Sequence, residues 1–479
     1  MRTIPKVFAL FICLCVSFAF ADTHSLLILH TNDIHGHVKA DPLGQGGLPY
    51  VSAFVKEMRA QRGDLLLLDG GDVMRKGDLI AEKTEHRILY EAMKKIGYTA
   101  GAMGNHDNFH GYDHLRECSE IAGMPILCLN SLDDTGSPRF APSTIVECNG
   151  LKVALIGLTT LAGGAFKSID KCGEQLRLEA ERLENQIDLT VAVVHIGRKE
   201  CILLSEKAPT IDVFVSGHTH EALHEAALVP ETGALIVQAG QYAQYVGVLD
   251  LTVDPAQKKV ITAESRLVSM DPETVTPDQE MIAWLDAEEE RIFPGAGEIV
   301  GETGQVIQIP DLVRIASAAL QWKAGADIAF CHTFVMRSNQ REGAITANSI
   351  FQSAGQRGDQ VVLTELSGEQ IRVYLNCLSN ARQGKTAWYG FSGKMEKADE
   401  AGKWNLVSDL EMAKNYQVAI PLYQWENLMG ECAEPDSPLA TLPKTPPIAD
   451  YSVADAMTDY LREVKKSGGS VEALLATLN

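Results

Sequence analysis

The chain contains the stretch Leu65-Leu66-Leu67-Leu68-Asp69-Gly70-Gly71-Asp72, an apolar run that ends in a carboxylate. Four other stretches repeat this arrangement, each with an apolar run followed closely by side chains that can bind a metal ion. Each run has the length of a buried strand rather than a helix. Side chains that leave the carboxyl ends of neighbouring strands in an open α/β sheet converge on one crevice. The pattern therefore predicts one site built from five strand ends.

The five strand ends carry two carboxylates, one amide and four imidazoles: Asp33, His35, Asp72, Asn105, His195, His218 and His220. This mixture suits borderline divalent ions such as Zn or Mn, whereas an all-oxygen set would suit Mg or Ca. Asp72 is the candidate to bridge two cations, because Gly70 and Gly71 let the backbone turn tightly. A single Asp-x-His or His-x-His pair is more often ordinary loop chemistry, so the prediction of a two-metal site depends on the complete set.

These stretches resemble the successive signature blocks of the calcineurin-like metallophosphoesterases. The blocks are His30-Thr31-Asn32-Asp33-Ile34-His35-Gly36, Asp69-Gly70-Gly71-Asp72, Gly104-Asn105-His106-Asp107, His195, and Gly217-His218-Thr219-His220. The first block is similar to that of the secreted 5′-nucleotidases. The resemblance implies one metal ion held by Asp33, His35, Asp72 and His220, and a second held by Asp72, Asn105, His195 and His218. It also implies that His106 is the catalytic histidine facing the substrate, with Asn105 beside it.

Strand-like runs interleaved with helical patterns at 48–62 and 87–96 predict a layered α/β domain. The resemblance implies a four-layer α/β/β/α sandwich at 22–268, followed by a smaller α+β substrate-binding domain at 300–479. Between them, residues 269–299 change composition towards proline and acidic residues, which predicts a linker and a bridging helix.

The C-terminal part resembles the substrate-binding domain of the 5′-nucleotidases through segments such as Gly325-Ala326-Asp327-Ile328-Ala329. Arg337 is the candidate for a bidentate grip on phosphate, with a structural ion pair as the alternative. The loop that would supply an aromatic ring for base stacking differs in this chain. Tyr423 and Trp425 are therefore the candidates for substrate binding, Trp388 or Tyr389 could stack instead, and core packing is the alternative for each ring.

One departure lies beside the predicted catalytic histidine. The family commonly places an aspartate three residues after that histidine, and this chain has Phe109 there. Asp107 or Asp113 could replace the missing carboxylate. Otherwise His106 acts without a carboxylate partner and titrates at a different pH.

Residues 1–21 have the basic start, apolar core and small-residue cleavage site of a secretory signal peptide, with cleavage expected after Ala21. An uncleaved anchor is the alternative, but the apolar core is short for a membrane span. We therefore expect a secreted or periplasmic protein without a later membrane span. Eight of the ten cysteines lie beyond this segment and could pair in an oxidising compartment, although the sequence does not reveal the pairs.

The formal net charge is −21, and removal of the two basic residues in the predicted signal peptide makes it −23. A chain this acidic repels nucleic-acid backbones and anionic lipid, which disfavours a polymeric nucleic acid as partner. A small phosphate ester could still bind, because two divalent cations would dominate the local field.

The sequence therefore predicts a hydrolase for phosphate esters of nucleotides, in which two cations activate the attacking water. Three alternatives stay open: a phosphoesterase for 2′,3′-cyclic nucleotides or UDP-sugars, a sulfur-ester hydrolase, and a catalytically weak binding module. Neither the identity of the metal nor the oligomeric state follows from the sequence.

Overall fold

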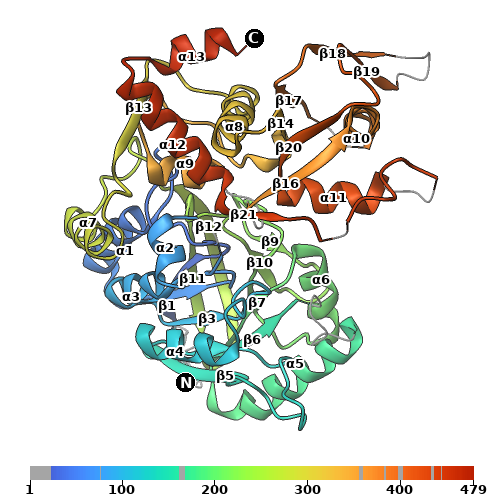
Figure 1. The fold of residues 1–479 in the computed structure, drawn as a ribbon. Coiled ribbons are helices and arrows are strands. Elements are labelled where there is room, and N and C mark those ends of the chain that lie inside the picture. The colour runs from blue at the N-terminus through green and yellow to red at the C-terminus, as the bar shows by residue number, and fades with distance from the viewer. Residues whose placement is uncertain are drawn as a thin grey trace, which may run out of the picture.

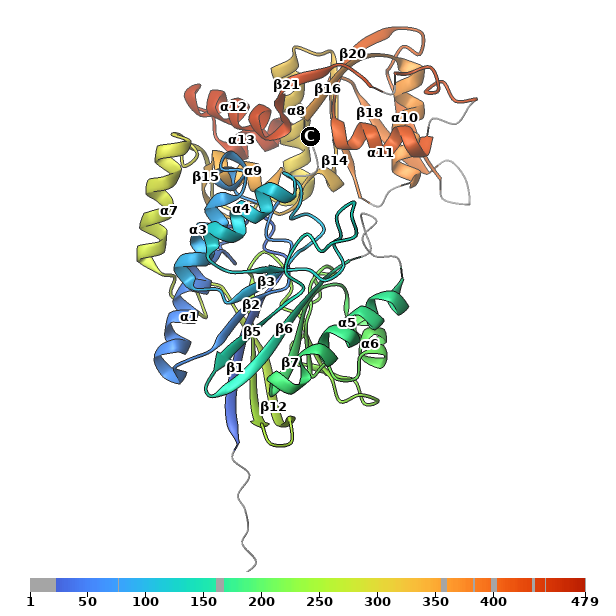
Figure 2. The ribbon, with the colours of Figure 1, turned by 90° about the horizontal axis from the view of Figure 1, so that it is seen from below.

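The computed structural model describes residues 23–75, 77–160, 168–354, 360–381, 384–397, 403–432, 436–443 and 445–478. The predicted signal peptide and the expected first mature residue, Asp22, lie outside the described residues. Figures 1 and 2 show an N-terminal lobe, coloured blue to yellow-green, and a C-terminal lobe, coloured mainly orange and red. We use N-terminal lobe for the part up to residue 269 and C-terminal lobe for the part from residue 299.

Two six-stranded sheets form the centre of the N-terminal lobe. The first has the order β12-β11-β1-β2-β3-β4, with bounds Lys259–Ser269, Tyr245–Asp254, His24–Thr31, Leu66–Asp69, Ala100–Ala102 and Ile126–Leu127. The second has the order β5-β6-β7-β8-β10-β9, with bounds Ser143–Cys148, Leu151–Thr159, Leu189–His195, Val213–Val215, Leu235–Val237 and Ala227–Leu228. Strands β1, β2 and β3 run parallel to one another, as do β7 and β8.

Helices cover the outer face of each sheet (Figure 2). The first sheet is covered by α1 (Leu48–Arg62), α2 (Leu79–Lys83), α3 (Arg87–Ile96) and α4 (Tyr112–Ala122), and the second by α5 (Ile169–Leu183) and α6 (Arg198–Lys207), with a short η1 (Glu184–Gln186). The helices predicted at 48–62 and 87–96 are confirmed with these bounds. The 3.6-residue apolar spacing that predicts them is the spacing that buries one helix face against a sheet.

Alternation along the strands explains the layers. In β1, Leu27 and Leu29 belong to the core beneath the helices, whereas Leu26 and Ile28 belong to the core between the two sheets. Successive strand side chains point to opposite faces, so a strand buried on both faces carries a nearly continuous apolar run, here Leu26 to Leu29. Three stacked cores therefore separate four layers, and the predicted α/β/β/α sandwich is confirmed.

The segment between the lobes contains one helix, α7 (Gln279–Ile292), which begins at an Asp278 cap that accepts two backbone N–H groups. Helix α7 packs against α1 of the N-terminal lobe, where the Ser52 hydroxyl donates a hydrogen bond to the Asp278 carboxylate. The acidic helix predicted within the linker is therefore present.

The C-terminal lobe is built on a five-stranded sheet with the order β17-β14-β20-β16-β21. Its strands are Thr386–Tyr389, Ile328–His332, Asn415–Pro421, Gln360–Ser367 and Ile448–Ser452, and two small sheets pair β13 (Ile299–Thr303) with β15 (Gly343–Thr346) and β18 (Gly393–Lys397) with β19 (Trp404–Ser408). The remaining elements are α8 (Ile309–Ala324), η2 (Thr333–Val335), α9 (Ala347–Ser353), α10 (Gly368–Ala381), α11 (Leu422–Cys432), α12 (Val453–Lys466) and α13 (Val471–Thr477). One core lies on the α8 and α12 face, and another lies on the α10 and α11 face.

The two lobes share a buried polar contact. Asp78, at the start of α2, is fully buried, and its Oδ1 accepts from Asn348 Nδ2 at 2.9 Å and from Gln352 Nε2 at 2.8 Å. Its Oδ2 accepts the backbone N–H of Lys39 at 2.7 Å. Asn348 also accepts the backbone N–H of Leu79 at 2.9 Å, so one side chain of α9 closes two bonds to the N-terminal lobe.

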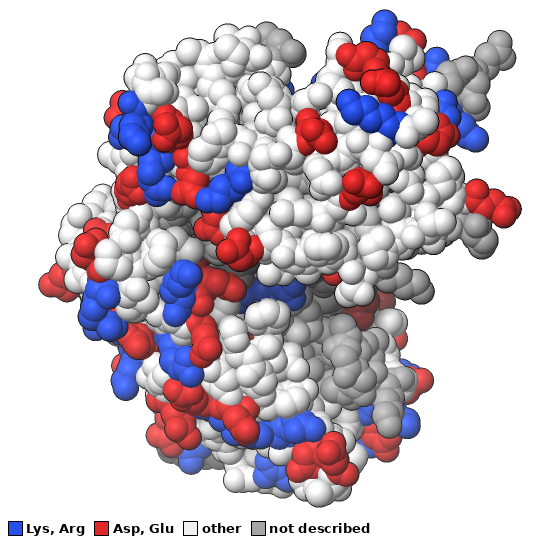
Figure 3. Space-filling view, viewed as in Figure 1, with Lys and Arg blue, Asp and Glu red and all other residues white. Residues whose placement is uncertain are grey.

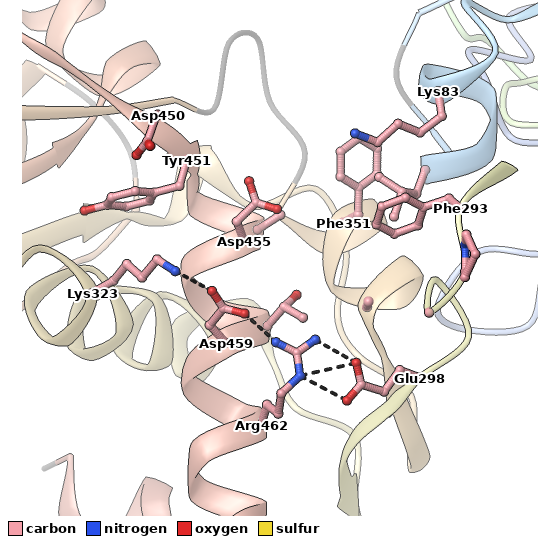
Figure 4. A pocket seen from close by; sticks show the side chains of 16 residues that line it. Lys83, Phe293, Glu298, Lys323, Phe351, Asp450, Tyr451, Asp455, Asp459 and Arg462 are labelled. Atoms are coloured by element: carbon pink, nitrogen blue, oxygen red, sulfur yellow. Dashed lines mark hydrogen bonds and ion pairs between the residues drawn. The ribbon is translucent and has the colours of Figure 1, made fainter.

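A cavity of about 470 Å³ lies beside this contact, between α2, the end of α7 and α12. Figure 4 shows a chain of ion pairs along its wall, from Lys323 to Asp459, from Asp459 to Arg462, and from Arg462 to Glu298. These charges are partly exposed, so each pair contributes about 0–1 kcal/mol to stability.

Acidic and basic side chains are interspersed over both lobes on the face shown in Figure 3. Among the described residues, no helix combines the length and apolar character needed to cross a membrane. Cys377 and Cys432 form a disulfide between α10 and α11, and the other six cysteines among the described residues are buried thiols. Burial raises the pKa of several of these thiols, that of Cys201 to about 12, which makes them poor nucleophiles.

Candidate two-metal site

All five predicted strand ends meet at one edge of the sandwich. Strands β1, β2 and β3 are neighbours in one sheet, and β7 and β8 are neighbours in the other. Their carboxyl ends point the same way, so the residues that follow them gather where the two sheets face each other. The predicted ligand residues from both sheets therefore lie in one place.

The backbone around these ligands is unusual. Five of them have a positive φ, which L-residues other than glycine adopt at a cost of about 1–2 kcal/mol; they are Asp33 (52°), His35 (49°), Asp72 (58°), His218 (77°) and His220 (57°). Gly104 provides the room that Asp72 needs, since a Cβ at this glycine would clash with the Asp72 carboxylate. Strain of this kind persists where the surrounding structure holds a side chain in one functional orientation.

The first ligand group consists of Asp33, His35 and His220, whose ligand atoms lie within 4.8 Å of one another. Asp33 Oδ1 is 3.2 Å from His220 Nε2 and 3.6 Å from His35 Nε2. The other carboxylate oxygen, Oδ2, accepts from Asn32 Nδ2 and from the backbone N–H of His218, which holds Oδ1 towards the imidazoles.

The second ligand group consists of Asp33, Asp72 and His195, again within 4.8 Å of one another. Asp72 Oδ2 lies 3.1 Å from His195 Nε2 and 3.8 Å from His35 Nε2, so one oxygen faces ligands of both groups. The Nδ1 of His195 is 2.8 Å from the carbonyl oxygen of Gly70, which fixes Nδ1 as the donor and leaves Nε2 to bind a cation. The His218 ring lies beside the His195 ring, at 5.2 Å between centroids.

Metal ions fit these residues because the ligand atoms lack other partners. Asp33 Oδ1, Asn105 Oδ1 and His195 Nε2 are buried and form no hydrogen bond with any of the described residues. Burying a polar atom without a partner is costly, so three such atoms in one cluster indicate that something else satisfies them. Carboxylate, amide and imidazole atoms at these separations are the donors that borderline divalent cations accept.

Electrostatics support the same interpretation. Burial lowers the pKa of His195, but the negative charges of Asp72 and Asp33 outweigh it and raise the pKa to about 10. Burial raises the pKa of Asp33, whereas the 3.2 Å contact with His220 and the charges of His195 and His35 lower it overall. The cluster therefore concentrates negative charge that attracts a cation, be it a proton or a metal ion.

His106 lies at the rim of this cluster. Its backbone N–H donates to Asp72 Oδ1 at 2.8 Å, and its Nε2 lies 4.0 Å from Asp72 Oδ2. Its Nδ1 is 3.1 Å from Arg75 Nη1, and the guanidinium of Arg75 lies 5.3 Å from the centre of the Phe109 ring. Arg75 is a residue of the site that the sequence analysis did not single out.

Asp107 and Asp113, the two carboxylates that could have replaced the missing aspartate, contact other groups. Asp107 accepts the backbone N–H groups of Asp72, Met74 and Gly104, which ties two strand-end loops together. Asp113 pairs with Arg116 on α4. These contacts favour the alternative in which neither carboxylate serves His106, whose Nδ1 lies 3.1 Å from Arg75 Nη1.

A cavity of about 280 Å³ opens onto the cluster and receives side chains from both lobes. It is lined by His35, Asp72, Arg75, Asn105, His106, His218, His220 and Tyr242 from the N-terminal lobe and by Arg337 and Tyr423 from the C-terminal lobe. Arg337 Nε is buried and has no hydrogen-bond partner in the part of the chain that the structure describes. The Tyr423 ring packs edge-on against Phe334 at 5.5 Å, which leaves it on the cavity wall. The structure thus brings two of the three predicted substrate residues to the cavity above the predicted metal ligands.

The prediction that Trp425 binds the substrate is wrong. Its side chain is fully buried in the core beneath α10 and α11, and its ring stacks with Tyr374 at 6.5 Å. Residues two apart on a helix point about 200° apart, so Trp425 faces the core when Tyr423 faces the cavity. Trp388 stacks on Phe391 at 5.5 Å, and with Tyr389 it lines a separate cavity of about 560 Å³.

Comparisons with known proteins agree with this architecture. Residues 26–222 match the model of the calcineurin-like phosphoesterase family, and residues 300–430 match the model of the 5′-nucleotidase C-terminal domain. A 5′-nucleotidase of Vibrio parahaemolyticus is 26% identical over 471 residues, covering 84% of this chain and 83% of the relative. The crystal structure of a 5′-nucleotidase precursor from Thermus thermophilus has a TM-score of 0.68 at 22% identity, covering 92% of this chain and 97% of its own. The sulfate thiohydrolase SoxB of the same species has a TM-score of 0.65 at 16% identity, covering 92% and 94%, and both likenesses concern the fold.

Proposed function

We propose that this chain, which belongs to the calcineurin-like phosphoesterases that carry a 5′-nucleotidase C-terminal domain, hydrolyses phosphate esters of nucleotides with two divalent cations. The observation that carries the proposal is the cluster of ligand atoms without hydrogen-bond partners, set beneath a cavity lined by both lobes. A relative of similar length named as a 5′-nucleotidase supports the nucleotide as substrate.

We assign one cation to Asp33, His35, Asp72 and His220 and the other to Asp72, Asn105, His195 and His218. The Oδ2 atom of Asp72 supports the assignment, because it lies 3.1 Å from His195 Nε2 and 3.8 Å from His35 Nε2 and so faces both groups. Four imidazoles favour Zn or Mn over Mg or Ca. When bound, such cations lower the pKa of water and neutralise phosphoryl oxygens.

The chain's own residues then orient the substrate. His106 and Asn105 line the cavity next to the ligands, where an imidazole N–H and an amide N–H can donate to oxygens that gain charge in the transition state. His106 Nε2 is also placed to give its proton to the leaving oxygen. No covalent bond between enzyme and substrate is required.

The C-terminal lobe holds the rest of the substrate. Arg337 presents a guanidinium to the cavity, and a guanidinium can bind two oxygens of one phosphate or carboxylate. Tyr423 offers a ring on which a nucleobase can stack. A small ester that spans from the cations to Tyr423 would thus contact both lobes.

For the full chain we propose a secretory signal peptide at 1–21, a phosphoesterase domain at 22–268, a linker with a bridging helix at 269–299 and a substrate-binding domain at 300–479. The end of β12 at Ser269 and the start of β13 at Ile299 support the two internal boundaries. A secreted or periplasmic location follows from the proposed signal peptide.

Phosphate release tests the function directly. The mature protein, supplied with Mn or Zn, is assayed on 5′-nucleotides, 3′-nucleotides, 2′,3′-cyclic nucleotides and UDP-sugars, beside Asp72→Asn and the exposed control Asp134→Asn. We expect hydrolysis that depends on the metal and falls about 10³-fold in Asp72→Asn, because losing a bridging ligand removes several kcal/mol of transition-state stabilisation.

Different outcomes point to the alternatives. Release from cyclic nucleotides or UDP-sugars alone would change the substrate class, and turnover of a sulfur ester alone would replace the nucleotide. Binding of metal without turnover of any substrate would indicate a binding module and contradict the proposal.

A further inference from the structure

Arg75 lines the cavity, and neither the proposed metal ligands nor the proposed substrate contacts include it. It lies in the loop after β2, three residues beyond Asp72, and its φ is 82°. An arginine in this region costs about 1–2 kcal/mol relative to an ordinary conformation. The same strained backbone occurs at five proposed metal ligands, so Arg75 shares the feature that marks the site residues.

Contacts with His106 and Phe109 help to orient the guanidinium of Arg75. Nη1 lies 3.1 Å from His106 Nδ1, and the guanidinium carbon lies 5.3 Å from the centre of the Phe109 ring. Phe109 is 55% exposed, and its ring also contacts that of His110, at 5.0 Å between ring centroids. A cation over an aromatic face is held by the ring's electrostatic field, so Phe109 serves as a platform for Arg75.

The contact with His106 determines where the imidazole proton resides. A guanidinium has only donors, so His106 Nδ1 must accept, and the neutral ring carries its proton on Nε2. Nε2 is the atom 4.0 Å from Asp72 Oδ2 and therefore the atom that faces the metal cluster. A histidine used to donate a hydrogen bond to a substrate oxygen needs this tautomer and this orientation.

We propose that Arg75, supported by Phe109, is a positioning residue that holds His106 as the Nε2–H tautomer with its proton directed at the substrate. The role as a donor to substrate rests on the proposed function. The predicted tautomer does not depend on that function, because Arg75 contacts His106 and Phe109 within the chain itself. His106 thus gains from a cation the orientation that a carboxylate could have provided.

The experiment measures the tautomer of His106 and the steady-state kinetics of hydrolysis separately. Side-chain ¹⁵N spectra of the full mature chain, metal-free and loaded with zinc, are compared for wild type, Arg75→Met, Arg75→Lys and Phe109→Ala, with His106→Gln to identify the signal. Arg291→Met is the matched control, because Arg291 lies on α7 and pairs with Glu288. Thermal unfolding of each variant establishes that it is folded.

We expect wild-type His106 to carry its proton on Nε2 and Arg75→Met to populate the Nδ1–H form. With a phosphomonoester, kcat of Arg75→Met should fall about 10- to 100-fold, as for loss of a charged hydrogen bond, while KM changes by less than about twofold. Relative to Arg75→Met, Arg75→Lys should recover part of the Nε2–H population and part of kcat. Phe109→Ala should lose less kcat than Arg75→Met.

Three results would overturn the proposal: an Nδ1–H tautomer in the wild type, an unchanged tautomer in Arg75→Met, or a rise in KM without a fall in kcat. The last would make Arg75 a direct substrate contact. If Arg75→Met does not fold, Arg75→Lys and Phe109→Ala give the same readouts. Absence of hydrolysis by the wild type would contradict the proposed function alone, since the spectra still report on Arg75.

Discussion

Replacing Asn348 by leucine tests the buried contact that joins the two lobes. Asn348 donates to Asp78 Oδ1 and accepts the backbone N–H of Leu79, both at 2.9 Å, and its side chain is nearly buried. Losing a hydrogen bond to a charged group costs about 1.5–3 kcal/mol, and a buried N–H left unpaired costs a further 1–3. We therefore expect the free energy of unfolding to fall by about 3–5 kcal/mol.

The pH dependence of this loss has a definite sign. Burial raises the pKa of Asp78 to about 7, above its ordinary value of 3.8, although the hydrogen bond from Asn348 lowers it. The folded chain therefore keeps a proton that the unfolded chain has lost, and the stability contributed by Asp78 falls as the pH rises from about 4 to about 7. Because Asn348 favours the charged form, the leucine variant should lose about 1 kcal/mol more at pH 8 than at pH 5.

Guanidinium unfolding followed by circular dichroism at the two pH values measures both quantities. Exposed Asn185→Leu is the control and should change stability by less than about 0.5 kcal/mol. A loss for Asn348→Leu below about 1 kcal/mol, or an equal loss at both pH values, would refute the reasoning about Asp78.

Three further predictions concern the C-terminal lobe. Trp425→Ala should lower the free energy of unfolding by about 3–5 kcal/mol, measured by denaturant titration, because it empties a fully buried site. Tyr423→Ala should raise KM for a nucleotide about tenfold with kcat retained, as expected for one lost stacking contact; Tyr389→Ala should leave the steady-state kinetics unchanged. Cys377→Ser should cost about 4 kcal/mol, since the bond to Cys432 closes a loop with a sequence separation of 55, and an unchanged melting temperature would contradict that estimate.

The metal ligands could be predicted because their chemistry is local. Each one lies within a few residues of the end of a strand-length apolar run. Parallel neighbouring strands bring such ends together whatever the rest of the chain does. The helices α1 and α3 could also be predicted from the sequence, because their apolar spacing is regular and a glycine follows each. Strand β12 was not predicted, since most of its side chains are at least partly exposed and it lacks a continuous apolar run.

Arg75 could not be identified from the sequence because an arginine in a loop has no distinctive spacing. It contacts a histidine 31 positions away, and only the fold brings them together. The unexpected Phe109 was the one available signal that something other than a carboxylate serves His106. Trp425 illustrates the opposite error, since its distance of two residues from Tyr423 on a helix already places the two rings on different faces.

The number of tightly bound metal ions tests the central claim most directly. The mature protein is equilibrated with Zn or Mn, freed of weakly bound ions and assayed by elemental analysis, together with Asp72→Asn and the control Asp134→Asn. The account predicts two ions per chain in the wild type and in the control, and one or fewer in Asp72→Asn because that residue faces both ligand groups. A wild type that holds one ion or none, or an Asp72→Asn variant that keeps two, would contradict it.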